Sequence, residues 1–198
     1  MRCKFQSSGA LYSDLTVFIS IVQSIIELRQ KALRRKLIHE LLLDKDLISI
    51  YINKDFGTQI FKHIPTNILD HEFATAIKLT EVQYDVIFAP KGMFKRGQKR
   101  FDIFIIHKDG ILINADLKTN FEPSKNAIYN LIKSGGKQAD HIVLDIRSSI
   151  PVDGLVSGLK EGLRDEKSVK SVLLFYKKHF FNLDRNMILS KRIYKLLK

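Results

Sequence analysis

The chain has 198 residues, of which 45% are hydrophobic, enough to bury the core of a globular protein. Lys and Arg total 33 against 21 Asp and Glu, so the net charge is +12 and the pI is about 9.7. This charge favours a polyanionic partner, although basic proteins without a nucleic-acid function also occur. The single cysteine, Cys3, excludes an internal disulfide and fits a reducing compartment.

The N-terminal part of the chain predicts a helix and no membrane span. Residues 15–26 are strongly apolar, but this run is too short to cross a bilayer, Gln23 interrupts it and no cleavage site follows. We therefore expect no signal peptide or transmembrane segment, and a cytoplasmic site of action. Apolar residues at three- and four-residue spacing predict a helix from residue 13 to about 43. Its basic face either contacts phosphates or keeps the chain soluble, and consists of Arg29, Lys31, Arg34, Arg35 and Lys36.

Helices and strands are expected to alternate in the rest of the chain. A helix within residues 63–79 is expected to have Asn67 as its cap. The further elements are a strand at 84–90, a basic loop at 91–100, a hairpin at 101–121, a helix at 123–136, a strand at 141–146, a helix near 153–165, a strand at 171–176 and a basic amphipathic tail at 184–198 that packs on the domain. This order predicts the α/β class, with a mixed β-sheet flanked by helices. We expect a helical N-terminal extension at 1–60 and an α/β domain at 61–198.

Charged residues interrupt the apolar hairpin FDIFIIHKDGILINADLKTNF at residues 101–121. The sequence KDG at 108–110 suits a three-residue loop whose glycine takes the left-handed conformation. This loop places Asp102 opposite Asp116, with Lys118 on the same face as Asp116. A two-residue loop would instead move Asp102 to the other side of the sheet. The register therefore decides whether the three charged groups meet.

Opposed carboxylates on such a hairpin predict a cation site. The side chains of Asp102 and Asp116 would start about 5 Å apart, and their repulsion is relieved by a divalent ion with oxygen ligands, Mg²⁺ or Mn²⁺. Lys118 would then orient the attacking water and offset charge on a phosphate. The alternative is that the charges protect an exposed edge hairpin from aggregation. Asp145, in an apolar strand, is expected to be a hydrogen-bonded core carboxylate.

These residues resemble the core of the PD-(D/E)xK (restriction-endonuclease-like) nuclease superfamily. Asp102 followed by Asp116-x-Lys118 matches its pattern of two acids and a lysine. HEFATAIKLTEVQYDVIFAP resembles its leading helix and strand, and SKNAIYNLIKSGGKQADHIVLDI resembles its later helix, Lys-Gln-Ala element and final core strand. Within this superfamily, residues from about 66 to 176 resemble the C-terminal tRNA nuclease toxin domains of CdiA-type contact-dependent inhibition proteins. That subgroup usually carries Glu where Asp116 stands here.

The resemblance implies a set of site residues. Glu72, Asp102 and Asp116 would bind Mg²⁺ or Mn²⁺, with Zn²⁺ as an alternative, Lys118 would be the catalytic lysine and Gln138 would support the site. Without the resemblance, Glu72 is an ordinary acid at a helix N-terminus and Gln138 satisfies a loop carbonyl. Nucleic-acid contacts are expected from Lys95, Arg96, Lys99, Arg100 and Lys137.

The sequence thus favours a metal-dependent nuclease whose substrate is tRNA, with DNA as the other candidate. The resemblance also implies a cognate immunity protein as a partner. Two other hypotheses remain open at this point. One is a DNA endonuclease of a restriction, repair or mobile-element system, and the other is a non-catalytic basic module that binds nucleic acid or a protein on the same scaffold.

Overall fold

A computed structural model describes residues 20, 22–24, 28–36, 38–40, 45–64, 66–90, 94 and 98–198. Its strands are β1 (Leu47–Ile52), β2 (Gln59–His63), β3 (Tyr84–Phe88), β4 (Ile103–His107), β5 (Leu112–Asn120), β6 (His141–Ile146), β7 (Ser171–Tyr176) and β8 (His179–Asp184). Its helices are α2 (Asp70–Glu81), α3 (Lys125–Gly136), α4 (Val152–Asp165), α5 (Arg185–Leu189) and α6 (Ile193–Leu196), and a helical segment at 28–36 precedes them.

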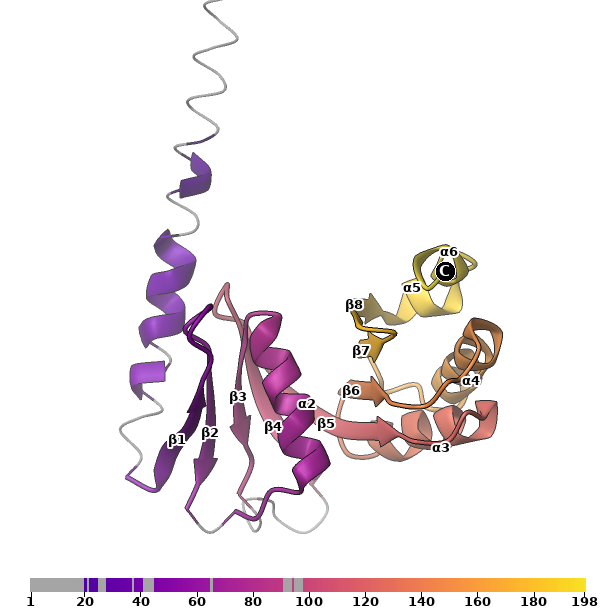
Figure 1. Ribbon diagram of the computed structural model, residues 1–198, viewed down its shortest axis with the longest axis horizontal. Coiled ribbons are helices and arrows are strands. Elements are labelled where there is room, and N and C mark those ends of the chain that lie inside the picture. The colour runs from indigo at the N-terminus through magenta and orange to yellow at the C-terminus, as the bar shows by residue number, and fades with distance from the viewer. Residues whose placement is uncertain are drawn as a thin grey trace, which may run out of the picture.

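The eight strands form one mixed sheet whose spatial order follows the chain from β1 to β8 (Figure 1). Four neighbouring pairs are antiparallel, namely β1–β2, β3–β4, β4–β5 and β7–β8. The other three, β2–β3, β5–β6 and β6–β7, are parallel and are linked by the crossover helices α2, α3 and α4. The expected α/β class with a mixed sheet flanked by helices is confirmed.

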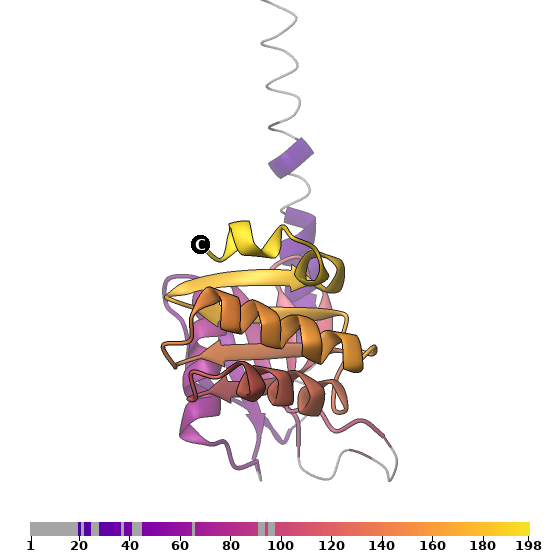
Figure 2. The same ribbon diagram turned by 90° about the vertical axis from the view of Figure 1, so that its right-hand side faces the viewer.

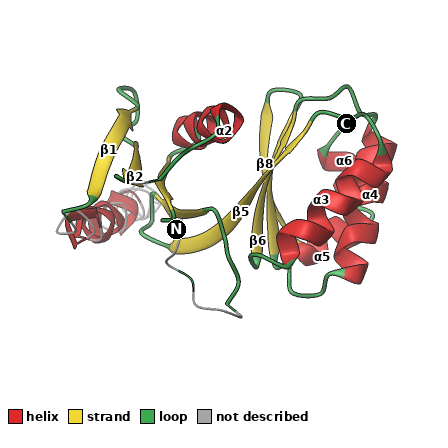
Figure 3. Ribbon diagram, turned by 90° about the horizontal axis from the view of Figure 1, so that it is seen from below, coloured by secondary structure: helices red, strands yellow, loops and turns green. Residues whose placement is uncertain are grey.

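Helices lie on both faces of this sheet. α2 lies on one face, and α3 and α4 lie side by side on the other (Figures 2 and 3). Adjacent residues of β6 belong to the two cores, because successive side chains of a strand point to opposite faces. Val143 packs in the cluster that contains Leu79 of α2, and Leu144 packs in the cluster that contains Ile132 of α3 and Leu159 of α4. The prediction that the strand at 141–146 is buried on both faces is therefore confirmed.

The sheet begins earlier than the sequence predicted. β1 and β2 are part of it, so the expected boundary between residues 60 and 61 falls within a strand. Most side chains of β1 are exposed or half-buried, which removes the alternating apolar pattern that would have identified a strand. The helix expected between 13 and 43 is confirmed at residues 20, 22–24, 28–36 and 38–40, and its other residues lie outside those described. No helix among the described residues is long and apolar enough to cross a membrane.

Two further element boundaries differ from expectation. α2 begins at Asp70 with Leu69 as its N-cap, so the predicted cap Asn67 lies outside the helix. The sequence did not predict the edge strand β8, and the predicted tail at 184–198 forms two short helices, α5 and α6. Ile188 and Ile193 are fully buried in the cluster beneath α3 and α4. The expected packing of this tail on the domain is confirmed.

One residue of the N-terminal basic face is held by a buried acid. Arg34 Nε lies 2.5 Å from Asp85 Oδ2 and Arg34 Nη2 lies 2.8 Å from Asp85 Oδ1, while Asp85 itself is completely buried in β3. Gln59 N–H donates a third hydrogen bond to Asp85 at 2.7 Å. The ion pair raises the pKa of Arg34, with the hydrogen bond to Asp85 as the largest cause. Arg34 therefore joins the N-terminal helix to the sheet.

We expect Arg34→Ala to lower the free energy of unfolding by about 3 kcal/mol, because it leaves a buried carboxylate without its cation. Urea unfolding followed by circular dichroism measures the change. Arg35→Ala is the matched control, since Arg35 is the exposed neighbour on the same helical segment. Equal stabilities of the two variants would show that the buried pair contributes nothing.

Glycines bring α4 unusually close to α3. A Cβ atom at Gly158 would lie 2.6 Å from the carbonyl oxygen of Lys125 and 2.7 Å from Ile128 Cβ. Gly162 repeats the pattern one turn later, where a Cβ atom would lie 2.7 Å from Ile132 Cβ. Neither contact leaves room for a methyl group, so the backbone of α4 packs directly against Ile128 and Ile132 of α3.

We expect Gly158→Ala to lower the free energy of unfolding by about 2 kcal/mol, since the overpacking outweighs the better helix propensity of alanine. Gly154→Ala, on the same helix, is the control, because its new Cβ would meet only Ile150 Cγ1 at 3.3 Å. Thermal unfolding of both variants measures the difference. A Gly158→Ala variant as stable as Gly154→Ala would contradict the close packing.

Candidate functional site

The hairpin of β4 and β5 has the three-residue loop that the sequence predicted. His107 N–H donates to the carbonyl of Ile111 at 3.1 Å, and Gly110 has the expected left-handed conformation with φ of +81°. The ladder pairs Ile103 with Ala115, so its next step places Asp102 opposite Asp116. The register that brings the two aspartates together is therefore confirmed.

Asp116 is a completely buried carboxylate between the sheet and α3. Its Oδ2 atom lies 2.6 Å from Lys118 Nζ, but this contact lacks hydrogen-bond geometry, and Oδ2 has no hydrogen-bond partner among the described residues. A Cβ atom at Gly135 of α3 would come within 3.0 Å of the same oxygen. Because Gly135 has no side chain, α3 leaves enough space for the carboxylate of Asp116.

Burial, followed by the charge and hydrogen bond of Asp102, raises the pKa of Asp116 to about 8, while Lys118 opposes the shift. Asp102 turns its own carboxylate toward the neighbouring strand, where Oδ2 accepts a hydrogen bond from Leu117 N–H at 2.9 Å. The pair therefore disfavours two negative charges at neutral pH. A divalent cation would remove that penalty if it took the place beside Oδ2 that Lys118 Nζ occupies at 2.6 Å.

Gln138 joins this pair from the turn that follows α3. With its amide nitrogen directed at the site, it donates to the carbonyl of Arg100 at 2.9 Å and to Asp116 Oδ1 at 3.2 Å. Both expectations for this residue therefore hold, since Gln138 satisfies a loop carbonyl and also contacts the predicted site. The structure brings together Asp102, Asp116, Lys118 and Gln138.

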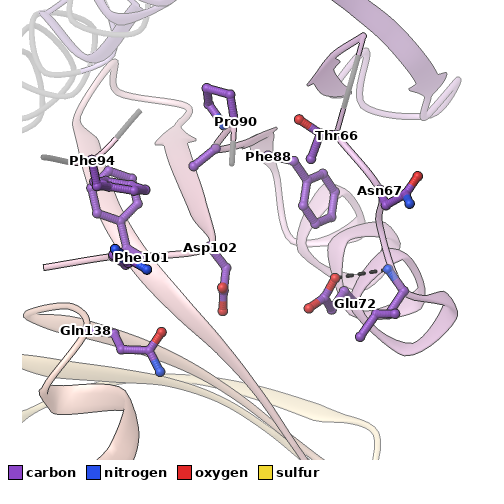
Figure 4. Close-up of a pocket in the computed structure, with 12 residues that line it drawn as sticks. Thr66, Asn67, Glu72, Phe88, Pro90, Phe94, Phe101, Asp102 and Gln138 are labelled. Carbon is purple, nitrogen blue, oxygen red and sulfur yellow. Dashed lines mark hydrogen bonds between the residues drawn. The ribbon is translucent and has the colours of Figure 1, made fainter. Parts of the chain in front are cut away.

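Glu72 lines the same cleft but has another partner. Its Oε2 atom accepts a hydrogen bond from Leu69 N–H at 3.0 Å, as an acid in the first turn of a helix commonly does (Figure 4). Glu72, Asp102 and Gln138 surround one opening of about 570 Å³. No group of three His, Cys, Asp or Glu side chains in the described part of the chain is arranged to hold a metal ion. The structure therefore joins two of the three predicted ligands and keeps Glu72 as a helix cap across the cleft.

The predicted phosphate contacts have different surroundings. Arg100 is exposed and lines the cleft next to Asp102, and Lys137 is exposed beside Gln138. Lys99 instead binds Asp140 at 2.7 Å and the carbonyl of Gly136 at 3.2 Å, which lowers the pKa of Asp140. Lys99 therefore has a structural role that the sequence did not suggest. Lys95 and Arg96 lie outside the described residues.

Aromatic rings line the side of the cleft beyond the carboxylates. Phe88, Phe94 and Phe101 border it, and the ring centroids of Phe94 and Phe101 are 4.8 Å apart in an edge-to-face arrangement. Phe88 ends β3, Phe101 lies two residues before β4 and Phe94 lies in the loop between these strands. The sequence could have indicated that Phe88 and Phe101 lie near the site, because they stand next to Ala89 and Asp102. The loop at 91–100 joins the two neighbouring strands, and these residues lie at or beside the strand ends that it joins.

Comparison with protein-family models, with curated proteins and with solved structures found no significant match for this chain.

Asp116 makes stability depend on pH. The folded protein keeps a proton on Asp116 up to about pH 8, whereas the unfolded chain loses it near pH 3.8. Between these values the folded state binds more protons, so rising pH lowers the free energy of unfolding by up to about 1.4 kcal/mol per unit. We expect Asp116→Asn to remove this dependence in metal-free buffer with EDTA, as measured by urea unfolding from pH 5 to 8. Asp153→Asn, which removes the charge of an exposed acid in α4, is the control. Parallel pH profiles for wild type and Asp116→Asn would contradict the raised pKa.

Proposed function

We propose that this protein is a metal-dependent phosphodiesterase that cleaves nucleic acid. The observation that carries the proposal is the opposed pair Asp102 and Asp116, with Lys118 and Gln138 beside it. Asp102 and Gln138 border the cleft, and Asp116 is buried behind them. A divalent ion, when bound, supplies charge stabilisation and an activated water. The raised pKa of Asp116 supports a cation there, because the deprotonated pair needs a counter-charge.

Each residue of the cluster has a chemical role in this proposal. Asp102 and Asp116 hold the ion, and the Leu117 N–H bond keeps the Asp102 carboxylate turned toward its partner. Lys118 lies within 2.6 Å of Asp116, where its charge offsets negative charge that develops on the phosphate. Gln138 orients Asp116 and holds the backbone of Arg100 at the entrance. Glu72 would join the metal site only by giving up its bond to Leu69.

Charge and cleft chemistry support nucleic acid as the substrate. The net charge is +12, and Arg100 and Lys137 are exposed at or beside the cleft. The rings of Phe94 and Phe101 offer surfaces for an unpaired base. The order of α2, the β3–β5 strands, α3 and β6 is the order expected from the resemblance to PD-(D/E)xK nucleases. The CdiA-type toxin domains favour tRNA over DNA and suggest an immunity protein that covers the cleft.

The proposal is tested by incubating the purified protein with labelled tRNA and duplex DNA in Mg²⁺, Mn²⁺ or EDTA. We expect cleavage that requires the ion and falls at least 100-fold in Asp116→Asn and in Lys118→Ala, because the first variant loses a ligand of the ion and the second loses the positive charge beside it. Asp109→Asn, on the same hairpin, should cleave like the wild type.

The outcomes separate the alternatives. Cleavage of duplex DNA in preference to tRNA would identify a DNA endonuclease on the same scaffold. Binding of tRNA without cleavage under any ion, and without any effect of Asp116→Asn, would identify a non-catalytic binding module and end the enzyme proposal.

A further inference from the structure

A second cleft lies on the α2 face of the sheet, at the carboxyl ends of the parallel strands β6 and β7. It has a volume of about 520 Å³ and shares no lining residue with the cleft at Asp102. Lys78 and Glu81 border it from α2, Arg147 from the end of β6, and Lys177 and Lys178 from the turn after β7. Ligand sites of open α/β sheets commonly lie at this edge, because loops and helix ends leave a crevice there.

A buried carboxylate holds two of these cations in place. Asp145 is completely buried, and its oxygens accept from Lys78 Nζ at 2.7 Å, Arg147 Nε at 3.0 Å and Thr75 Oγ1 at 3.0 Å. Arg147 Nη2 also donates to the carbonyl of His71 at 3.1 Å. This confirms Asp145 as a hydrogen-bonded core residue. The cluster still carries one net positive charge, and both cations are partly exposed toward the cleft.

The other two cations occupy a strained turn. Tyr176 pairs with His179, so Lys177 and Lys178 form a two-residue hairpin loop with φ of 49° and 66°. Both angles are in the left-handed region, where Asn-Gly is strongly preferred and a lysine costs about 1 kcal/mol. The hairpin geometry requires these angles of any residues in the loop, so the two lysines occupy it at a cost in backbone energy that Asn-Gly would not have. Lys177 Nζ additionally lies 5.1 Å from the ring centre of Tyr176.

The charges of the cleft do not cancel. Lys78, Arg147, Lys177 and Lys178 supply four positive charges and Asp145 and Glu81 supply two negative ones, which leaves a net charge of +2 within one crevice. Asp145 holds Lys78 and Arg147 in place, and the hairpin turn carries Lys177 and Lys178. Four cations arranged around one cleft can bind the negatively charged oxygens of a phosphate group.

We propose that this second cleft binds the phosphate groups of a nucleotide. The nucleotide is either one unit of a nucleic-acid strand or a free nucleotide, because the two present the same chemistry to the four cations. This cleft is separate from the carboxylate pair. The proposal therefore does not depend on whether the protein cleaves nucleic acid at Asp102 and Asp116.

The test replaces the strained turn with the residues that its geometry prefers. Lys177→Asn with Lys178→Gly removes two charges and suits the left-handed backbone, so this double variant should unfold at the same temperature as the wild type or higher. Affinity is measured by fluorescence anisotropy of a fluorescein-labelled 12-nucleotide RNA in EDTA, with ATP as a competitor. We expect the double variant to bind the RNA at least tenfold more weakly than the wild type. The slope of the logarithm of the binding constant against the logarithm of the salt concentration should be smaller by about 1.4, which corresponds to two lost phosphate contacts on a single strand.

The matched control removes the same charge elsewhere. Lys54→Ser with Lys167→Ser changes two exposed lysines in turns that do not border the cleft. Lys177→Arg with Lys178→Arg keeps the charge and should restore binding. Selective loss of RNA binding assigns the cleft to a nucleic-acid strand, and selective loss of ATP competition assigns it to a free nucleotide. Equal affinities of the turn variant and the control variant for both ligands would overturn the proposal.

Discussion

The register of the β4–β5 hairpin is the constraint on which the candidate site depends. Its three-residue loop is possible because Gly110 takes a left-handed conformation with φ of +81°. That loop sets Asp102 opposite Asp116, and a slip of one residue would send every side chain of one strand to the other face. The carboxylate pair, the contact with Lys118 and the raised pKa of Asp116 all follow from this register.

Packing far from the hairpin supports the pair. Gly158 and Gly162 let α4 approach α3 closely, and the end of α3 places Gly135 directly over Asp116. The turn after α3 then directs Gln138 at the same carboxylate. A buried acid without a hydrogen bond on one oxygen is costly, and within this tightly packed layer the nearby ammonium of Lys118, 2.6 Å from that oxygen, offsets its charge.

The excess of positive charge is distributed between structural and exposed positions. Several cations are bound to buried or partly buried acids, among them Arg34, Lys78, Lys99, Lys118, Arg147 and Lys170. Others are exposed in two separate regions, with Arg100 and Lys137 near the carboxylate cleft and Lys177 and Lys178 at the second cleft. Net charge alone therefore indicates a class of partner, whereas the ion pairs decide which cations remain available to it.

The sequence by itself determined the helices and strands between residues 84 and 176, the hairpin register and the burial of Asp145, because each depends on local periodicity or on one loop. Only the tertiary structure decided that β1, β2 and β8 extend the sheet, since their half-exposed side chains carry no clear alternation. It also decided that Lys99 binds Asp140 and that Arg34 binds Asp85. A side chain's partner depends on which other segments come within about 3 Å, and spacing along the chain does not contain that information.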